Sequence, residues 1–386
     1  MACQLKTPAV KPESVTVTFV SSHALHGGAE LHLASVIDRL GSDWVASIVT
    51  LADGPLVGRL RGGGHSVEVV PTPARLGMLI AALKLRRVLR AQAPELVHAD
   101  GVKAALVCAL ATVGTRIPIL WFKVDYSRDG WLARLIAARC RLIGGISASV
   151  TEVFRGSQRE RVRVVPCGIP DLPVDRAASR RLVLGLVQAD GDAPVVAHLG
   201  RLHPRKGQLE LIEAAPAVLA ARPEVRFLLV PPPAETDSER EFEQRLRQRA
   251  QELGVAAEIF LSPRRGRSVE VMAGCELVAV PSVPDVVSGW REGFGLVGVE
   301  AMAVGTPVVG YADGALPETL GDCAVLVQTG DRTALGEAIV RILGDRALSQ
   351  RLVRCGSSRA ERYRLASTIG VLKECYREAV GPRKAD

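Results

Sequence analysis

The stretch REGFGLVGVEAMAVGTPVVG, residues 291–310, decides how the second half of the chain folds. It holds two carboxylates, Glu292 and Glu300, eight positions apart across a glycine-rich turn. Apolar residues after Gly295 keep helical spacing until Pro307 ends the helix, and a short apolar run follows. The stretch therefore predicts a turn, a helix that begins at the turn, and a strand after the helix.

The glycine-rich turn before this helix is suited to an anion. The first amides of a helix lack intrahelical acceptors, the helix dipole favours negative charge, and glycines let a phosphate approach the backbone closely. A carboxylate ahead of such a site is not there to bind phosphate, so sugar hydroxyls are the natural partners of Glu292 and Glu300. Alternatively, the glycines only pack closely and both glutamates lie on the surface; the stretch alone does not decide between these interpretations.

Two further signals flank the stretch and favour the functional interpretation. GRL at 200–202, with Lys206-Gly207 shortly after it, follows one strand, and GALPE at 314–318 follows another. This order of signals resembles that of the family-4 retaining glycosyltransferases of the GT-B fold, which carry G-R-L, K-G, P-S, E-G-F-G-L with a second glutamate, and G-x-P-E. The resemblance covers nearly the whole chain. It implies an α/β protein of two Rossmann-like, doubly wound parallel-sheet domains that face each other across a cleft.

Length and composition agree with two domains. A chain of 386 residues with 48% hydrophobic residues can bury two cores. Residues 1–14 lack an apolar region, so we interpret them as a loose leader and not as a secretory signal. No apolar run reaches the length of a membrane span, which predicts a soluble or peripheral protein. The eight cysteines form no C-x-x-C pair, which argues against a zinc site or a disulfide scaffold and favours a reducing, cytoplasmic location.

The net charge of +8 is unevenly distributed. Residues 1–180 contain 23 lysines and arginines against 14 acidic residues, and the remainder is nearly balanced. The positive excess of the first half indicates either an anionic partner or surface, or basic helix faces that are exposed to solvent. We favour the second interpretation. The helix over 78–92, with Lys84 and three arginines, is compatible with lying on an anionic membrane, but an ordinary covering helix is preferred. The basic residues form no run and are not interleaved with aromatic ones, so no nucleic-acid partner is expected.

The first half alternates strands and helices. Alternation predicts parallel pairing and ligand binding at the carboxyl ends of the strands. Three polar side chains at these ends, His98, Asp100 and Lys123, are candidates for the acceptor side. We expect this domain to cover residues 15–175, with strands near 15–20, 45–51, 66–70, 96–99, 118–124 and 142–147 and helices near 31–40 and 76–92.

The first strand leads into a glycine loop, SSHALHGGAE at residues 21–30, that opens an apolar helix. This unit resembles the first-domain glycine loop of the same family. The resemblance implies that Gly27 and Gly28 lie against the donor phosphates or the acceptor.

The second half begins after a polar, proline-bearing linker at 171–181. We expect a nucleotide-sugar domain over 182–364 and a final amphipathic helix within 365–386, which in the family crosses back to pack on the first domain. Strands are expected at 195–199, 225–230, 259–261, 277–280 and 325–327, with helices at 209–220 and 240–253.

Glycosyl transfer from a nucleotide diphosphate sugar leaves negative charge on the departing phosphate. Arg201 offers a planar fork of donors and Lys206 a compact charge, so the two can converge on one diphosphate. With the amides after Gly295 they form a metal-free anion clamp, and no metal or other cofactor is expected. Glu300 then accepts from the ribose hydroxyls, and Glu292 contacts the donor sugar. The remaining donor-binding candidates are Gly200, Gly293, Phe294, Gly295 and Leu296.

Retention of configuration is implied by the resemblance and not by spacing. In the favoured account for this family the leaving phosphate itself takes the acceptor proton. Many members place a histidine at the end of the strand over 118–124, and ungapped comparison puts Val124 there. Because the histidine is absent, Lys123 or Asp125 would have to replace it. We choose Asp125 as the group that orients the acceptor; alternatively, Asp125 is only a loop carboxylate in a salt bridge.

Three functions from different classes follow. The first is a retaining hexosyltransferase that moves a sugar from a nucleotide diphosphate sugar, UDP favoured and GDP possible, to a small soluble metabolite or natural-product intermediate, with a glycolipid acceptor at a membrane as a variant. The second is a nucleotide-sugar epimerase or hydrolase of the same fold. The third is a binding module without catalysis, which should have lost Lys206 or Glu292; both are present. The sequence makes no prediction of oligomeric state.

Overall fold

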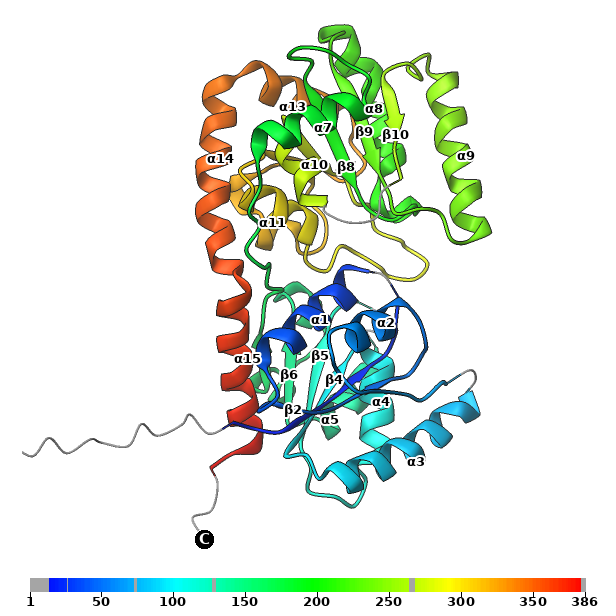
Figure 1. Cartoon of the computed structure of the whole chain (residues 1–386), viewed down its shortest axis with the longest axis vertical. Coiled ribbons are helices and arrows are strands. Elements are labelled where there is room, and N and C mark those ends of the chain that lie inside the picture. Colours follow the sequence, from blue (N-terminus) through cyan, green and yellow to red (C-terminus); the bar gives the residue numbers. More distant parts are fainter. Residues whose placement is uncertain (1–13, 26, 73–74, 127–129, 264–267, 383–386) are drawn as a thin grey trace, which may run out of the picture. The chain divides into compact units, whose positions relative to one another are not determined.

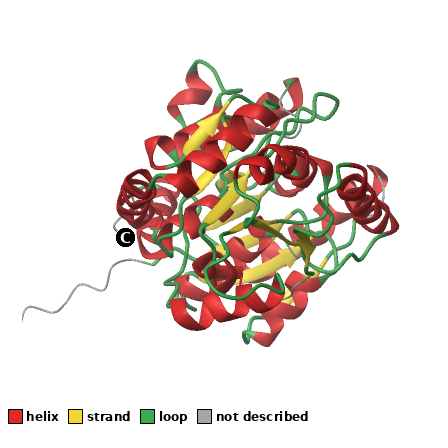
Figure 2. Cartoon of the chain, turned by 90° about the horizontal axis from the view of Figure 1, so that it is seen from above, coloured by secondary structure: helices red, strands yellow, loops and turns green. Residues whose placement is uncertain are grey.

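The computed structural model describes residues 14–25, 27–72, 75–126, 130–263 and 268–382. It is an α/β fold with two parallel sheets covered by helices (Figures 1 and 2). The chain divides into two compact units. The first contains the chain up to Phe122, residues 139–142 and the chain from Lys373 on, and the second contains residues 123–138 and 143–372.

The first sheet has seven strands in the order β3-β2-β1-β4-β5-β6-β7. Strand β1 pairs in parallel with β2 on one side and β4 on the other, so the strand order reverses beside β1. Every residue of β1, β4 and β5 is buried, as in a parallel sheet covered on both faces. The strands are β1 Val17–Ser21, β2 Val45–Thr50, β3 Val67–Val69, β4 Leu96–Asp100, β5 Ile119–Lys123, β6 Leu142–Gly145 and β7 Val162–Val164.

Helices connect these strands, and α3 packs on α4. The helices of this part are α1 Gly28–Leu40, α2 Pro55–Gly62, α3 Arg75–Gln92, α4 Val102–Ala111, α5 Trp131–Arg139, α6 Ser157–Glu160 and the 3-10 turn η1 Ser149–Thr151.

The second sheet has six strands in the order β10-β9-β8-β11-β12-β13. Its order reverses between β8 and β11, which are parallel neighbours. A core of aliphatic and aromatic side chains, among them Val196, Phe227, Leu277 and Tyr311, lies on this sheet. The strands are β8 Val195–Leu199, β9 Arg226–Val230, β10 Ile259–Leu261, β11 Leu277–Val280, β12 Val308–Tyr311 and β13 Val325–Val327.

The helices of this part begin with local signals that the sequence carries. Asp175, Thr236, Asp331 and Asp345 each cap a helix N-terminus with a side-chain oxygen, and Thr236 with Glu239 forms a capping box. The helices are α7 Arg176–Leu186, α8 Gln208–Ala221, α9 Asp237–Glu252, α10 Ser268–Gly274, α11 Leu296–Ala303, α12 Leu316–Thr319, α13 Arg332–Gly344, α14 Arg346–Ala360 and α15 Leu365–Val380, with 3-10 turns η2 Pro204–Lys206, η3 Gly321–Cys323 and η4 Glu361–Tyr363.

The expected two-domain α/β architecture is confirmed, but two local expectations are wrong. The linker at 171–181 ends earlier, because Asp175 accepts from the Ala178 amide and starts α7, which packs on α10. Strand β7 was not predicted as a strand; it is short and only partly buried. None of the helices in the described ranges is long and apolar enough to span a membrane.

The cysteines differ from expectation at one pair. Cys323 of η3 and Cys355 of α14 form a disulfide. The pair has no sequence signal, because the two residues are 32 positions apart and meet only where α14 packs on η3. One disulfide is not a disulfide scaffold, but it differs from the reducing environment that the cysteine pattern favours. The other cysteines of the described ranges are buried and outside any disulfide: Cys108, Cys140, Cys167, Cys275 and Cys375.

Candidate functional site

The strongest candidates meet at the strand reversal of the second sheet. Lys206 ends the loop after β8, and Glu292 lies in the loop after β11. The Lys206 Nζ atom donates to the Glu292 Oε2 atom at 2.8 Å. Because β8 and β11 are neighbours whose connections leave in opposite directions, their carboxyl ends border the crevice in which such sheets bind ligands.

The Glu292 carboxylate is largely buried and well supplied with donors. Its side chain is 12% exposed, and besides Lys206 it accepts from the Ser282 hydroxyl at 2.9 Å. Burial acts to raise its pKa, but the charge and hydrogen bond of Lys206, the Ser282 hydroxyl and the Gly295 amide outweigh burial and hold the pKa of Glu292 below its usual value. Glu292 is therefore ionised at neutral pH.

Lys206 is fixed from three sides. The Nζ atom lies 5.2 Å from the centre of the Trp290 ring as well as beside Glu292. Its carbonyl accepts from the Nε2 atom of His198 at 2.8 Å. Burial lowers the pKa of His198 to about 4, so this imidazole is neutral and acts as a positioning donor. An ammonium has three donors, so Lys206 keeps donor capacity for a ligand.

Two glycines let the loops around the pair approach. Gly207 has φ +77°, and a Cβ atom there would lie 1.8 Å from the carbonyl oxygen of Pro281. Gly314 has φ +54°, and a Cβ atom there would lie 2.2 Å from the carbonyl oxygen of Glu292. Only glycine fits such positions, which explains the glycines of K-G and G-x-P-E. The Ala315 amide then donates to the Glu292 carbonyl at 2.8 Å.

The turn expected before Glu300 is present. Gly295 adopts the left-handed conformation, φ 80° and ψ 46°, and is the N-cap of α11. The amides of Gly298 and Val299 donate to its carbonyl, so Leu296, the first helical residue, lies at the open end of the helix. Glu300 lies one turn further along α11, and its side chain has no hydrogen-bond or ion-pair partner among the described residues. Burial raises the pKa of Glu300 to about 7.

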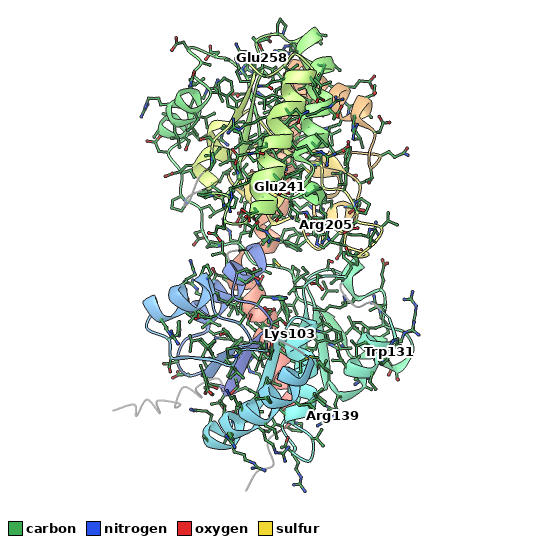
Figure 3. All side chains as sticks on the ribbon, turned by 90° about the vertical axis from the view of Figure 1, so that its right-hand side faces the viewer. Lys103, Trp131, Arg139, Arg205, Glu241 and Glu258 are labelled. Atoms are coloured by element: carbon green, nitrogen blue, oxygen red, sulfur yellow. A yellow bond between two sulfur atoms is a disulfide. The ribbon has the colours of Figure 1, made fainter. Side chains whose placement is uncertain are left out.

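Arg201 and Arg205 differ in their pairing. Arg201 is exposed and forms no ion pair with any described residue, while its carbonyl accepts from Gln208 at 2.6 Å. Arg205, labelled in Figure 3, pairs with Asp285 at 2.5 Å and lies 5.6 Å from the Trp290 ring centre. Arg201 thus carries an exposed guanidinium without an ion pair to a described residue, although its charge helps to lower the pKa of Glu239. Arg205 instead anchors the loop that carries Trp290.

Three other donor-side candidates have mainly structural surroundings. Phe294 is buried and packs edge to face against Tyr363, with 5.3 Å between the two ring centres. The Gly293 carbonyl accepts from the Ser147 hydroxyl at 2.9 Å. Gly200 follows β8, and a Cβ atom there would lie 3.3 Å from the Cε1 atom of His198. The phenyl ring of Phe294 is therefore directed into the core, and this residue offers a ligand at most its backbone.

In the first unit, the predicted glycine loop opens α1. Gly27 is its N-cap and Gly28 its first residue, and the Leu31 amide donates to the Gly27 carbonyl. Asp100 ends β4 as expected and is 6% exposed. Ser22, at the end of the neighbouring β1, donates through its hydroxyl to the Asp100 carbonyl at 2.7 Å. The loops after β1 and β4 therefore meet at the strand reversal of this sheet.

His98 is not at the strand end where we expected it. It lies within β4, is 1% exposed, and its Nδ1 atom is hydrogen-bonded to the Tyr376 hydroxyl at 2.9 Å. Phe19 and Phe122 lie beside its ring. Burial, with a smaller contribution from His32, lowers the pKa of His98 to about 3. His98 is therefore a neutral core histidine, and the acceptor-side role expected for it is corrected.

Lys123 and Asp125 end β5 and begin the next loop. Lys123 is 2% exposed, its Nζ atom donates to the Asp125 carbonyl, and it lies 5.8 Å from the Tyr126 ring centre. The Lys123 ammonium is thus directed inward. Asp125 is half-buried, and its role as acceptor-orienting group remains a prediction.

Several residues of this site were missed by sequence reasoning. His198, Ser282, Trp290 and Asp313 all position the Lys206–Glu292 pair or its loop; Asp313 accepts from Arg291 at 3.0 Å. Ser282 belongs to the P-S signal, so the sequence pattern points to this residue but not to its contact with Glu292. The others have no local signal, because each acts across strands.

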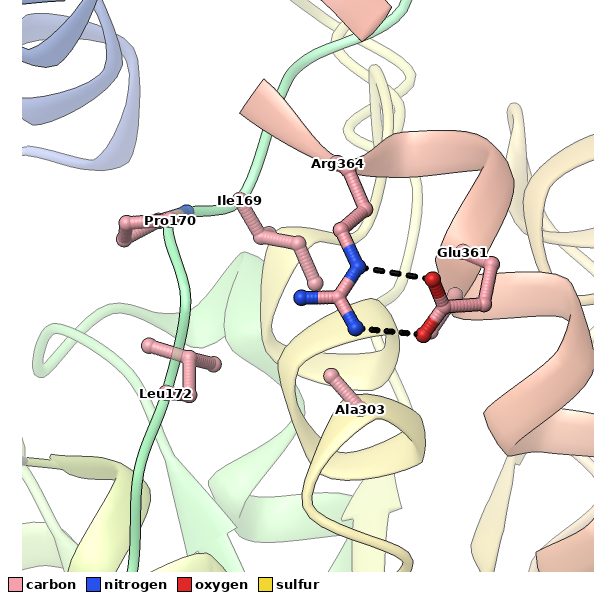
Figure 4. A pocket seen from close by; sticks show the side chains of 7 residues that line it. Ile169, Pro170, Leu172, Ala303, Glu361 and Arg364 are labelled. Atoms are coloured by element: carbon pink, nitrogen blue, oxygen red, sulfur yellow. Dashed lines mark hydrogen bonds and ion pairs between the residues drawn. The ribbon is translucent and has the colours of Figure 1, made fainter. Parts of the chain in front are cut away.

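A pocket elsewhere in the second unit does not belong to this site. It is lined by Ile169, Pro170, Leu172, Ala303, Ala360 and Arg364 (Figure 4). Two hydrogen bonds of 2.7 and 2.6 Å join Arg364 to Glu361 at its wall and occupy its charged groups (Figure 4). No group of three metal-ligating side chains occurs within the described residues.

Comparison with known proteins agrees with this geometry. Residues 187–359 match the family described as "Glycosyl transferases group 1", and residues 27–168 match "Glycosyl transferase 4-like domain". Each of the two segments is therefore similar to a glycosyltransferase domain. The matched ranges contain most of the candidate residues, from Gly27 to Glu300.

The chain is also similar to curated proteins and to solved structures. Over 266 residues the chain is 34% identical to D-inositol 3-phosphate glycosyltransferase of Nocardia farcinica, covering 66% of the chain and 56% of that protein. The chain thus spans just over half the length of the curated relatives it matches. Among solved structures, Anabaena HepE in complex with UDP and glucose has a TM-score of 0.79 at 24% identity, covering 93% of the chain and 98% of HepE. A glycosyltransferase from Rickettsia africae has a TM-score of 0.81 at 17% identity, with 96% and 100% coverage. The GT-B fold expected from the sequence is confirmed.

Proposed function

We propose that this protein is a retaining glycosyltransferase that moves a hexose from a nucleotide diphosphate sugar to an acceptor hydroxyl without a metal ion. The observation that carries the proposal is the Lys206–Glu292 pair beside the open N-terminus of α11. One strand reversal thus carries a cation, free helix amides and an ionised carboxylate. The cation and the amides suit a diphosphate, and the carboxylate suits the hydroxyls of a sugar, so together they match a nucleotide diphosphate sugar.

The donor diphosphate is bound by positive groups of the second unit. Arg201 has no competing ion pair, Lys206 retains donors besides the one given to Glu292, and the amides at the start of α11 add their dipoles. These groups stabilise the charge that develops on the leaving phosphate, in a preformed arrangement that needs little reorganisation. This is the support for a metal-independent reaction.

The two glutamates divide the remaining contacts. The Glu300 carboxyl has no partner among the described residues, and its pKa of about 7 reflects burial without compensation. Two ribose hydroxyls that donate to it would relieve that cost. Glu292 is held ionised and accepts from sugar hydroxyls on the face where the anomeric carbon reacts. Neither needs to act as a nucleophile if the leaving phosphate takes the acceptor proton, which is the basis for proposing retention.

The substrates are proposed from the relatives. HepE is described in complex with UDP and glucose, so a UDP-sugar is the favoured donor, with a GDP-sugar as the alternative. The relative from N. farcinica is named for D-inositol 3-phosphate, so a small phosphorylated polyol is the favoured acceptor. A glycolipid acceptor is the second candidate, favoured by the exposed Leu79 and Leu83 beside Arg87 on α3.

The test is release of nucleoside diphosphate from UDP- and GDP-sugars, with and without candidate acceptors. Release that depends on an acceptor is the expected result. Acceptor-independent turnover would favour an epimerase or hydrolase, and tight binding without turnover would favour a binding module.

A further inference from the structure

The Cys323–Cys355 disulfide joins two elements that lie next to α11. Cys323 ends η3, which comes directly after the segment that carries the G-x-P-E signal, and Cys355 lies in α14. Helix α14 packs both on η3 and on α11. The bond closes a segment that contains β13 and α13. It therefore fixes the chain after Glu318 against the helix that supports α11.

Close contacts lead from this bond to the open end of α11. Gly298, in the first turn of α11, faces Leu320, which precedes η3; a Cβ atom at Gly298 would lie 2.9 Å from the Leu320 Cδ2 atom. Near the other end of α11, a Cβ atom at Gly356 of α14 would lie 2.9 Å from the Met302 Cγ atom. Because groups packed this closely move together, a shift of η3 against α14 reaches the turn at Gly295.

The disulfide is also the most accessible part of the described cysteine set. Cys355 is half-buried, and it is the only cysteine of the described ranges that is not buried. Burial raises the pKa of the Cys108 and Cys275 thiols, which makes both poor nucleophiles. A small thiol that enters from solvent therefore meets the disulfide, from the Cys355 side, before it meets the buried thiols.

Hydrogen bonds hold the same elements together without the disulfide. The Arg359 guanidinium of α14 donates to the Thr319 carbonyl at 2.6 Å and to the Glu318 carbonyl at 2.5 Å. The Tyr363 hydroxyl donates to the Thr319 carbonyl at 3.2 Å. These contacts do not depend on the S–S bond, so its reduction should loosen α12 and η3 without unfolding them.

We propose that the Cys323–Cys355 pair is a redox switch that controls how firmly the start of α11 is held for the donor diphosphate. The proposal rests on the proposed function, which assigns the α11 amides to that diphosphate. Two molecules of a low-molecular-weight thiol reduce the S–S bond to two thiols and leave as one disulfide, and a low-molecular-weight disulfide reverses the exchange. In the oxidised form the site is preformed. In the reduced form the ligand must order α11 as it binds, which costs affinity.

The experiment compares the whole chain after oxidation with glutathione disulfide and after reduction with dithiothreitol. Calorimetry with UDP and with GDP should show tighter binding to the oxidised form, by about fivefold or more, the lower limit of typical coupling between two sites. Hydrogen–deuterium exchange should rise on reduction over residues 296–303 and 316–323, but not over α9, residues 237–252. Peptide mapping establishes which form each sample contains.

Two variants assign the effect to this pair. Cys323→Ser/Cys355→Ser cannot form the bond, so it should bind nucleoside diphosphate like the reduced wild type and respond to neither reagent. Cys275→Ala is the matched control, because it removes a buried thiol of the second unit and leaves the pair intact. It should keep the redox response. Thermal unfolding of each variant shows that the fold is retained.

Equal affinity in the oxidised and reduced wild type, or a response that persists in Cys323→Ser/Cys355→Ser, would overturn the switch. Exchange over residues 296–303 that does not change on reduction would overturn it as well, and would identify the bond as purely structural. Failure of UDP and GDP to bind either form would instead refute the proposed donor site. The exchange measurement needs no nucleotide, so it decides in that case too whether the bond controls α11.

Discussion

Replacing Lys206 by methionine should abolish most turnover while the neighbouring change Arg205→Met should not. Both changes remove one positive charge beside Trp290, and both side chains lie within cation–π distance of that ring. Only Lys206 contacts Glu292, whereas Arg205 pairs with Asp285. The two variants therefore separate a charge that acts on the donor from one that anchors a loop.

The magnitude follows from the burial of the pair. The side chains of Lys206 and Glu292 are 28% and 12% exposed, so the pair lies between a surface ion pair and a fully buried one. A surface ion pair contributes about 0–1 kcal/mol to stability, whereas removing one partner of a fully buried pair costs about 3–5 kcal/mol. We expect Lys206→Met to destabilise the fold by about 1–3 kcal/mol. Loss of a preorganised charge stabiliser lowers turnover by about 100- to 1,000-fold. Arg205→Met should stay within about tenfold of wild-type turnover, since it removes a positioning contact only.

The assay is nucleoside diphosphate release at saturating donor and acceptor, with circular dichroism to establish that both variants are folded. A folded Lys206→Met variant with near wild-type turnover would remove Lys206 from the reaction. Equal losses in the two variants would show that general positive charge, and not the contact with Glu292, is what matters.

Three further outcomes are expected. Glu300→Gln should raise the Michaelis constant for the donor by about tenfold with little change in turnover, because the ribose does not react. Glu292→Gln should instead lower mainly turnover. Identical changes of both constants in the two variants, measured in steady-state assays, would contradict this division. Because burial raises the pKa of Glu300 to about 7, this carboxyl is mostly protonated below that pH in the free protein. Calorimetric affinity for a nucleotide sugar should therefore fall as the pH drops below about 7, and Glu300→Gln should lose that dependence. An unchanged pH profile in the variant would assign the effect to another group. Excess chelator should leave turnover unchanged, and loss with rescue by magnesium or manganese would refute the metal-free clamp.

The sequence predicted the parts of the site that depend on neighbouring residues. The turn at Gly295, the helix after it and the placement of Glu292 before it are local, and so are the glycines at 207 and 314. The pairing of Lys206 with Glu292 was not predicted, because the two residues are 86 positions apart and meet only through the order of β8 and β11. The contact of Trp290 with Lys206 was not predicted for the same reason.

The wrong expectations have a common cause. His98 was taken as a strand-end residue, but its environment is made by Tyr376, 278 positions away, which buries it in the core. The Cys323–Cys355 disulfide likewise depends on the packing of α14 on η3. The linker was placed too far along the chain because the capping signal of Asp175 was not used. Local patterns predict elements, whereas long-range packing decides which polar side chains reach a ligand.

The most direct measurement is proton NMR of the products formed from an α-configured UDP- or GDP-hexose and a candidate acceptor. The account predicts a new anomeric signal with the α configuration of the donor, growing with nucleoside diphosphate in the wild type and absent in Lys206→Met. Free hexose as the only product, or a new β-linked signal, would contradict retaining glycosyl transfer at this site.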